Sequence, residues 1–217
     1  MKSPLTIVHL CSAANVFADA QSRFDEPKLY GVTDGKAVGT YLEGKFITSL
    51  AQQYSFQTGS AAKGIDLPEL QVDIKTTSIK QPQSSSPFAS ARQKVYGLGY
   101  ALLVFVYEKR DNKARSSARL VIRHVVFVGK ERTADYQTSR GLLQILGNDG
   151  SEEDLVAFMQ DKMLPADEIE LCRIARDLLR RRPVQGYLTI SNALQWRLQY
   201  KRVIHNAGTV EGILRVR

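Results

Sequence analysis

The chain has 217 residues, with 30 lysines and arginines against 22 aspartates and glutamates, a formal net charge of +8 at pH 7. This length suits one domain, and a hydrophobic content of 43% excludes an intrinsically disordered chain. A strongly basic balance favours a polyanionic partner, nucleic acid first and a membrane surface second.

Two further features limit the class of protein. The longest apolar run, residues 100–107, is far too short to span a membrane, and the N-terminal segment lacks the basic region of a signal peptide beyond Lys2. Cys11 and Cys172 form no CxxC pair and have no metal-ligand spacing, so we expect no zinc site. We expect buried free thiols in a cytoplasmic protein, with a disulfide between the two as the open alternative.

The first third of the chain predicts two helices ahead of a strand. A serine followed by a proline suits the start of a helix, so we expect one over residues 3–24. A polar loop over residues 25–35 leads to a second helix over residues 36–54, where apolar residues recur every four positions on one face. Residues 70–78 have the character of a strand.

The middle of the chain predicts the centre of a sheet. A polar loop over residues 81–87 precedes a helix over residues 88–96. Residues 100–109 form a continuous apolar run, which is typical of a strand buried on both faces. Residues 119–129 predict a second strong strand, and the basic connector 110–117 suits a hairpin between the two.

From residue 131 onward the pattern turns helical, with Ser151 and a first turn of acids marking one helix start. The fold class is therefore α/β: a mixed central sheet flanked by helices, with a helical C-terminal part. The elements expected here are helices over residues 138–146, from Ser151 onward, 167–182 and 191–204, with short strands over 187–190 and 212–217.

Residues 64–75 read GIDLPELQVDIK and hold the arrangement that most constrains function. Asp73 and Lys75 flank a single apolar residue, so on a strand both side chains point to the same face. Asp66 lies a short turn upstream. Carboxylates are natural ligands of Mg²⁺, and a nearby lysine can orient a water and offset charge at phosphorus. These residues therefore suit metal-dependent hydrolysis of a phosphodiester.

Two other acids could take part. Glu69 lies only four residues before Asp73, so it competes with Asp66 for the place of the first acid. Glu43 lies close to the edge of the apolar stripe on the helix over residues 36–54, so it leans toward whatever that helix packs on. It could add an outer or second metal ligand.

Asp66, together with Asp73, Ile74 and Lys75, resembles the PD-(D/E)xK nuclease superfamily, which includes most type II restriction endonucleases. The resemblance implies that the two acids bind Mg²⁺ and that the lysine assists the attacking water. An acid-bearing helix before the motif, and a helix and a buried strand after it, agree with this order. Two departures stand out: Ile65 replaces the proline of the motif, and the spacing between the acids is short.

The resemblance implies a type II restriction endonuclease, a Mg²⁺-dependent enzyme that cuts double-stranded DNA at a short specific sequence. It covers a catalytic core of about residues 36–129; the helical, basic part is about 131–217, and we expect a single domain over 1–217. A homodimer on a palindromic site, in a bacterial or archaeal cytoplasm, follows by analogy. The alternatives are a structure-specific repair or junction nuclease of the same superfamily and a non-catalytic basic DNA-binding protein.

Candidates for DNA contact come from the loop over residues 81–87, the helix after it and the densest cation cluster of the chain. In that cluster Arg173, Arg176 and Arg180 recur on one helical face, ahead of Arg181 and Arg182. Each candidate has a plain alternative, an exposed loop or a solvated helix face. The candidates are Gln81, Gln83, Ser84, Arg92, Gln93, Lys94, Arg173, Arg176 and Arg180.

Overall fold

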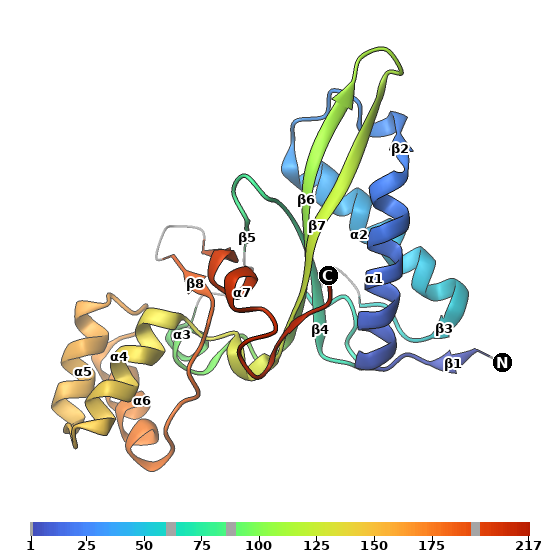
Figure 1. The fold of residues 1–217 in the computed structure, drawn as a ribbon. Coiled ribbons are helices and arrows are strands. Elements are labelled where there is room, and N and C mark those ends of the chain that lie inside the picture. The colour runs from blue at the N-terminus through green and yellow to red at the C-terminus, as the bar shows by residue number, and fades with distance from the viewer. Residues whose placement is uncertain (1, 60–63, 86–89, 192–195) are drawn as a thin grey trace. The chain divides into compact units, whose positions relative to one another are not determined.

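The computed structural model describes residues 2–59, 64–85, 90–191 and 196–217, and the chain divides into two compact units. The first unit comprises Met1–Ser84, Leu102–Val128 and Asn206–Arg217, and the second comprises Ser85–Ala101 and Gly129–His205. Figure 1 follows the chain through both by colour. The expectation of a single domain over residues 1–217 stays a prediction.

The first unit is organised around a sheet in which a long antiparallel hairpin joins β6 (Ala101–Asn112) to β7 (Ser117–Val128). β4 (Val72–Ser78) lies beside β6, and β10 (Ile213–Arg215) pairs antiparallel with β7, as does the short β2 (Asp25–Glu26). The apolar first half of β6 is buried between two neighbouring strands. The central strand, the hairpin and the terminal strand predicted from the sequence are confirmed.

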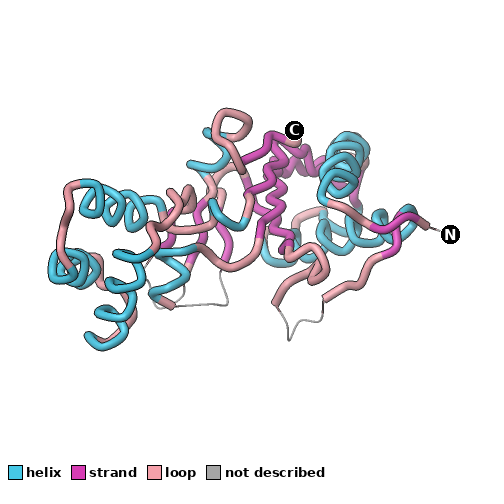
Figure 2. The backbone as a smooth tube through the Cα atoms, turned by 90° about the horizontal axis from the view of Figure 1, so that it is seen from below, coloured by secondary structure: helices cyan, strands magenta, loops and turns pink. Residues whose placement is uncertain are grey.

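Two helices pack on this sheet, α1 (Ile7–Arg23) against β7 and α2 (Gly35–Gln53) against β4 and α1. Figure 2 shows both helices beside the strands. Three aromatic rings join the layers: Phe46 lies 5.0 Å from Phe105 and 5.1 Å from Phe17, measured between ring centroids. The fold class is therefore α/β with a mixed central sheet flanked by helices, as expected.

The first helix begins later than the sequence predicts. Ser3 and Pro4 are not its first residues; they form β1 (Ser3–Pro4), which pairs in parallel with β3 (Tyr54–Ser55). Thr6 caps α1 instead, because its side chain accepts a hydrogen bond from the backbone amide of His9. Proline is favoured in the first turn of a helix, but a proline does not by itself start one, and here Pro4 pairs in a strand instead.

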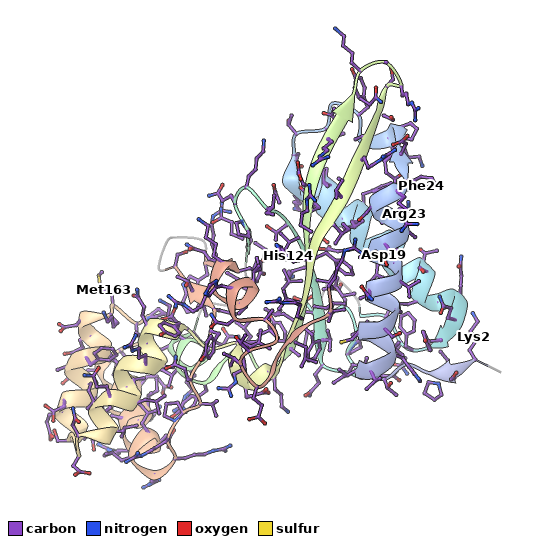
Figure 3. All side chains as sticks on the ribbon, in the orientation of Figure 1. Lys2, Asp19, Arg23, Phe24, His124 and Met163 are labelled. Carbon is purple, nitrogen blue, oxygen red and sulfur yellow. The ribbon has the colours of Figure 1, made fainter. Side chains whose placement is uncertain are left out.

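A buried carboxylate ties α1, β2 and α2 together. Glu26 accepts hydrogen bonds from Gln21 at 2.8 Å and from the Tyr41 hydroxyl at 2.5 Å, and it also binds Lys45. The Lys45 ammonium lies 4.3 Å from the ring centroid of Phe24, which Figure 3 labels near the C-terminal end of α1. A charge buried in this way needs several partners, and this site supplies them.

The second unit is mainly helical. Its core is formed by the apolar faces of α3 (Ala91–Tyr96), α4 (Tyr136–Gly147), α5 (Glu152–Asp161) and α6 (Glu168–Arg180). Ser151 and Asp154 form a reciprocal capping box at the start of α5, which confirms the predicted helix start. The described residues also include the short helical turns η1 (Pro27–Leu29) in the first unit and η2 (Lys130–Arg132) in the second.

The helix predicted over residues 191–204 is wrong. The structure has β9 (Arg197–Gln199), antiparallel to β8 (Thr189–Ile190), and then the short α7 (Lys201–Asn206). Trp196, Leu198 and Tyr200 are buried while the residues between them are exposed, and a burial period of two belongs to a strand. Residues 192–195 of the predicted helix lie outside the described residues.

Three remaining predictions have outcomes here. The helix expected over residues 88–96 is α3, capped by Ser90, and its first two positions lie outside the described residues. The loop expected over residues 81–87 contains the short β5 (Gln83–Ser85). Both cysteines are free, as expected, but half-buried. Within the described ranges no helix combines the length and the apolar character that crossing a membrane requires.

Asp135 should be one of the most sensitive positions of the second unit. This buried carboxylate accepts hydrogen bonds at 2.8 Å from the amide and hydroxyl of Thr138 and, through its other oxygen, from the amide of Ile190. Asp135→Ala leaves these donors unpaired, so we expect a loss of about 2–4 kcal/mol in the free energy of unfolding. Urea denaturation measures it. Asp135→Asn, which keeps an acceptor, should lose less, and equal losses would contradict this explanation.

Candidate active site

A tight turn brings the two acids of the motif face to face. The amide of Leu67 donates to the carbonyl of Val72 at 3.0 Å, and the amide of Val72 donates back at 3.2 Å. The next residues outward, Asp66 and Asp73, are therefore opposite each other on one face of an antiparallel pair. The strand begins at Val72 and not at residue 70, because residues 68–71 form the turn.

Asp66, and not Glu69, lies beside Asp73. One Asp66 carboxylate oxygen accepts a hydrogen bond of 2.8 Å from the amide of Ile74, which fixes the side chain along β4. Glu69 is exposed, and its carboxylate accepts from the amide of Gln57 at 3.2 Å. The geometry thus separates two acids that sequence spacing left in competition.

Lys75 completes this group, with its ammonium nitrogen 2.7 Å from Asp73 Oδ2. The Asp73 side chain is 3% exposed and the Lys75 side chain is 21% exposed, so the carboxylate is buried and the amine is reachable. Within the described residues no well-directed hydrogen bond reaches Asp73 Oδ2, so Lys75 acts on this oxygen as a nearby charge. Burial raises the pKa of Asp73 to about 7, Asp66 adds to the rise, and Lys75 opposes it.

Glu43 faces the same strand from α2. Burial raises the pKa of Glu43 to about 6, with Asp66 adding to the rise while Lys75 and Thr76 oppose it. Gly39, one turn earlier on α2, also faces β4, since a β-carbon built there would lie 3.6 Å from the carbonyl oxygen of Thr76, an ordinary van der Waals contact. The inward direction predicted for Glu43 agrees with this placement.

The donor set fits a divalent cation. Oxygen ligands from carboxylates are those that Mg²⁺ and Ca²⁺ prefer, and Asp66 and Asp73 are adjacent. Asp73 Oδ2 is buried without a well-directed hydrogen bond, the Lys75 ammonium 2.7 Å away offsets part of its charge, and a divalent cation would offset it further. In the part of the chain that the structure describes, no three acidic, histidine or cysteine side chains converge on one metal position. Glu43 lies near the pair, and its part in binding a metal stays a prediction.

The loop candidates for DNA contact are tied to the end of β4. The Thr77 hydroxyl lies 3.0 Å from the carbonyl oxygen of Gln83 and 3.3 Å from that of Gln81, either of which can accept its one proton, and it accepts from the amide of Gln83 at 2.9 Å. Ser84 follows directly in β5. Nothing in the sequence pattern singled out Thr77, because a threonine on a strand has no distinctive spacing. Contact of this loop with DNA stays a prediction.

Several cationic candidates of the second unit already have acidic partners. Arg92 binds Glu170 at 2.6 Å and Asp177 at 2.9 Å, and Arg176 binds Glu152 at 3.0 Å. These side chains of α3, α5 and α6 are between 30% and 60% exposed, and pairs with this much solvent contact add little stability. For these arginines to bind DNA, a backbone phosphate would have to replace the acidic side chain with which each is paired.

The other candidates of the second unit differ in exposure. Lys94 is buried, with its ammonium 5.3 Å from the ring centroid of Trp196, and the side-chain oxygen of Gln93 is buried without a hydrogen bond among the described residues. Arg173 and Arg180 are exposed on α6, and the acid nearest to Arg173 lies at 3.7 Å. Of these candidates, Arg173 and Arg180 are the most accessible to a large ligand.

Comparison with known proteins assigns the chain to a family. The family described as Type II restriction enzyme NspV matches residues 4–215. A relative from Nostoc sp. (strain ATCC 29411 / PCC 7524), named Type II restriction enzyme NspV, is 58% identical over 212 residues, which cover 98% of this chain and 96% of the relative. No solved structure matches this chain. The match includes both units and the acidic cluster, and the chain belongs to the type II restriction enzyme NspV family.

Proposed function

We propose that this type II restriction endonuclease hydrolyses phosphodiester bonds of double-stranded DNA at the cluster of Asp66, Asp73 and Lys75. The observation that carries the proposal is the pair of facing carboxylates with the Lys75 ammonium 2.7 Å from Asp73. The same residues, with Ile74 between the last two, resemble the PD-(D/E)xK motif, and we propose membership of that superfamily.

Each side chain has a role that its position supports. Asp66 and Asp73 would hold a divalent ion, Mg²⁺ in our proposal, and when bound this ion supplies a Lewis acid and lowers the pKa of water. Lys75, whose amine is reachable, would orient the attacking water and offset negative charge at phosphorus. Glu43 would add an outer ligand, or a ligand of a second ion, from the side of α2.

The remainder of the protein would hold the substrate. The net charge of +8 favours contact with the DNA backbone, and the candidates from Gln81 to Arg180 other than the buried Lys94 would supply part of it. A protomer with one such cluster cuts one strand, so we propose a homodimer whose two-fold axis matches that of a palindromic site. We place the protein in the cytoplasm of a bacterium or archaeon.

A digest of plasmid and phage DNA tests the proposal. With Mg²⁺ we expect discrete fragments whose sequenced ends share one short palindrome, and with EDTA in place of Mg²⁺ we expect none. The end sequences also give the recognition site and the stagger of the cut. Intact DNA with Mg²⁺, or a smear without common ends, would refute the proposal.

The affinity for Mg²⁺ should depend on pH. Protons and Mg²⁺ compete for the same carboxylates, and the pKa of Asp73 is raised to about 7 and that of Glu43 to about 6. The apparent Mg²⁺ affinity should therefore be constant above about pH 8 and fall below pH 7, by up to about tenfold per pH unit. Titration of cleavage rate with Mg²⁺ between pH 5.5 and 8.5 measures this. An affinity that does not change across this range would contradict the assignment of these acids.

A further inference from the structure

A cavity of about 630 Å³ lies in the second unit, at the C-terminal end of α6. This size falls within the range of about 300–1,000 Å³ that ligand sites usually have. Six charged side chains line it, of which four are cations and two are acids. The cations are Lys130, Arg180, Arg181 and Arg182, and the acids are Glu131 and Asp177.

The positive charge of this cavity is not cancelled by its own acids. Asp177 is paired at 2.9 Å with Arg92, a side chain that does not line the cavity. Glu131 is the remaining acid of the lining. Among the acids of the lining, Glu131 alone is without an ion pair among the described residues, and four cations surround the same cavity.

The end of α6 spreads its arginines around the cavity. The helix ends at Arg180, Arg181 has an extended backbone with φ −141° and ψ 107°, and Pro183 cannot continue the helix. Consecutive side chains on such a segment point in different directions, yet all three arginines line one cavity. Arg182 is fixed by a hydrogen bond of 2.9 Å from its guanidinium to the carbonyl oxygen of Leu146.

A helix dipole alone does not account for this cluster. Arginine in the last turn of a helix is favoured by the negative end of the dipole, which suffices for Arg180. The effect falls off within one turn, and Lys130 comes from η2, a different element. All four cations are exposed, and no described residue forms an ion pair with Arg180.

We infer that this cavity binds backbone phosphates of double-stranded DNA through Lys130, Arg180 and Arg181, a contact additional to the cluster of Asp66 and Asp73. Guanidinium groups bind phosphate oxygens bidentately, and exposed cations from two elements can be reached by a long polyanion. The cavity is also too large for a single phosphate ion. The inference rests on the proposed function, which makes DNA the substrate.

The test is the salt dependence of DNA binding by the Arg180→Ala/Arg181→Ala double variant. Binding is measured by fluorescence anisotropy in EDTA between 50 and 250 mM KCl, on one duplex that contains the mapped cleavage site and one that lacks it. We expect affinity for both duplexes to fall about tenfold or more and the slope of log K against log[salt] to become shallower by about 2. Arg140→Ala, which removes an exposed cation of the same unit outside the cavity, should leave the slope unchanged.

The outcomes separate the two proposals. A shallower slope in the double variant, restored in Arg180→Lys/Arg181→Lys, supports the inference. A slope equal to that of the wild type overturns it, even though a wild type that cuts DNA would keep the proposed function intact. If the slope is unchanged and 20 mM inorganic phosphate raises the Tm of the wild type but not of the double variant, the cavity binds a free anion and not DNA.

Discussion

Asp73→Asn should lower DNA cleavage by roughly 10³-fold or more and, in the absence of metal, raise the thermal stability of the protein. The loss of activity follows because the variant removes a negatively charged ligand from the Asp66–Asp73 pair. The gain in stability follows because the carboxylate is 3% exposed and one of its oxygens has no hydrogen bond among the described residues. A neutral amide of the same shape removes a buried charge.

The sign of the pH effect follows from the pKa of Asp73, which is raised from 3.8 to about 7. Between these values the folded protein binds a proton that the unfolded chain has released, so stability falls as the pH rises through this window. Above pH 7 the full cost is present, and we expect Asp73→Asn to be more stable there by roughly 1–3 kcal/mol. Below pH 4 the difference should vanish.

Thermal melts in EDTA from pH 4 to pH 8.5, together with the plasmid digest, measure both effects. Asp111→Asn is the matched control, because Asp111 is an exposed acid of the β6–β7 hairpin that binds Lys109 at the surface. This control should change neither activity nor the pH profile. Cleavage by Asp73→Asn at the wild-type rate would refute the active-site assignment, whereas lost cleavage with a lower Tm at pH 8 would refute only the burial argument.

Phe105→Ala should be the most destabilising single change in the first unit, by about 3–5 kcal/mol. Phe105 is fully buried on β6, and its ring meets Phe46 of α2 at 5.0 Å and Phe17 of α1 at 5.9 Å in edge-to-face geometry. Its removal leaves a cavity where both helices pack on the sheet. Since α2 also carries Glu43, cleavage should decline as the folded fraction declines.

Urea unfolding of the metal-free protein gives the free energy directly. Phe105→Leu should lose less, because a smaller cavity remains. Phe24→Ala removes the same ring from a position that is 54% exposed, and it should cost less than about 1 kcal/mol. If Phe105→Ala and Phe24→Ala were equally stable, the three-ring cluster would not be the centre of this core.

Much of the fold follows from periodic patterns in the sequence. The four-residue period over residues 36–54 predicts a helix that the structure places at Gly35–Gln53, and the apolar run over 100–109 predicts the central strand. Both patterns are long, so local alternatives could not compete. The short C-terminal elements are harder to predict: a helix is expected over residues 191–204, whereas the alternating burial of Trp196, Leu198 and Tyr200 belongs to a strand.

The candidate site was predictable only in part. That Asp73 and Lys75 share a face needs nothing beyond the two-residue period of a strand. The choice between Asp66 and Glu69 depends on hydrogen bonds across a turn, which spacing alone does not reveal. The partner of Arg92 is still harder to predict from the sequence, because Glu170 lies 78 residues further along the chain.

The closed pair of Leu67 and Val72 has a consequence for how such a site can evolve. The two acids meet because the backbone pairs on the inner side of the turn, and not because a fixed number of residues separates them. Residues 68–71 can therefore be lengthened or replaced while Asp66 and Asp73 keep their alignment. A family that conserves this pairing is free to vary the interval between its acids, so a search by motif spacing alone would overlook distant members.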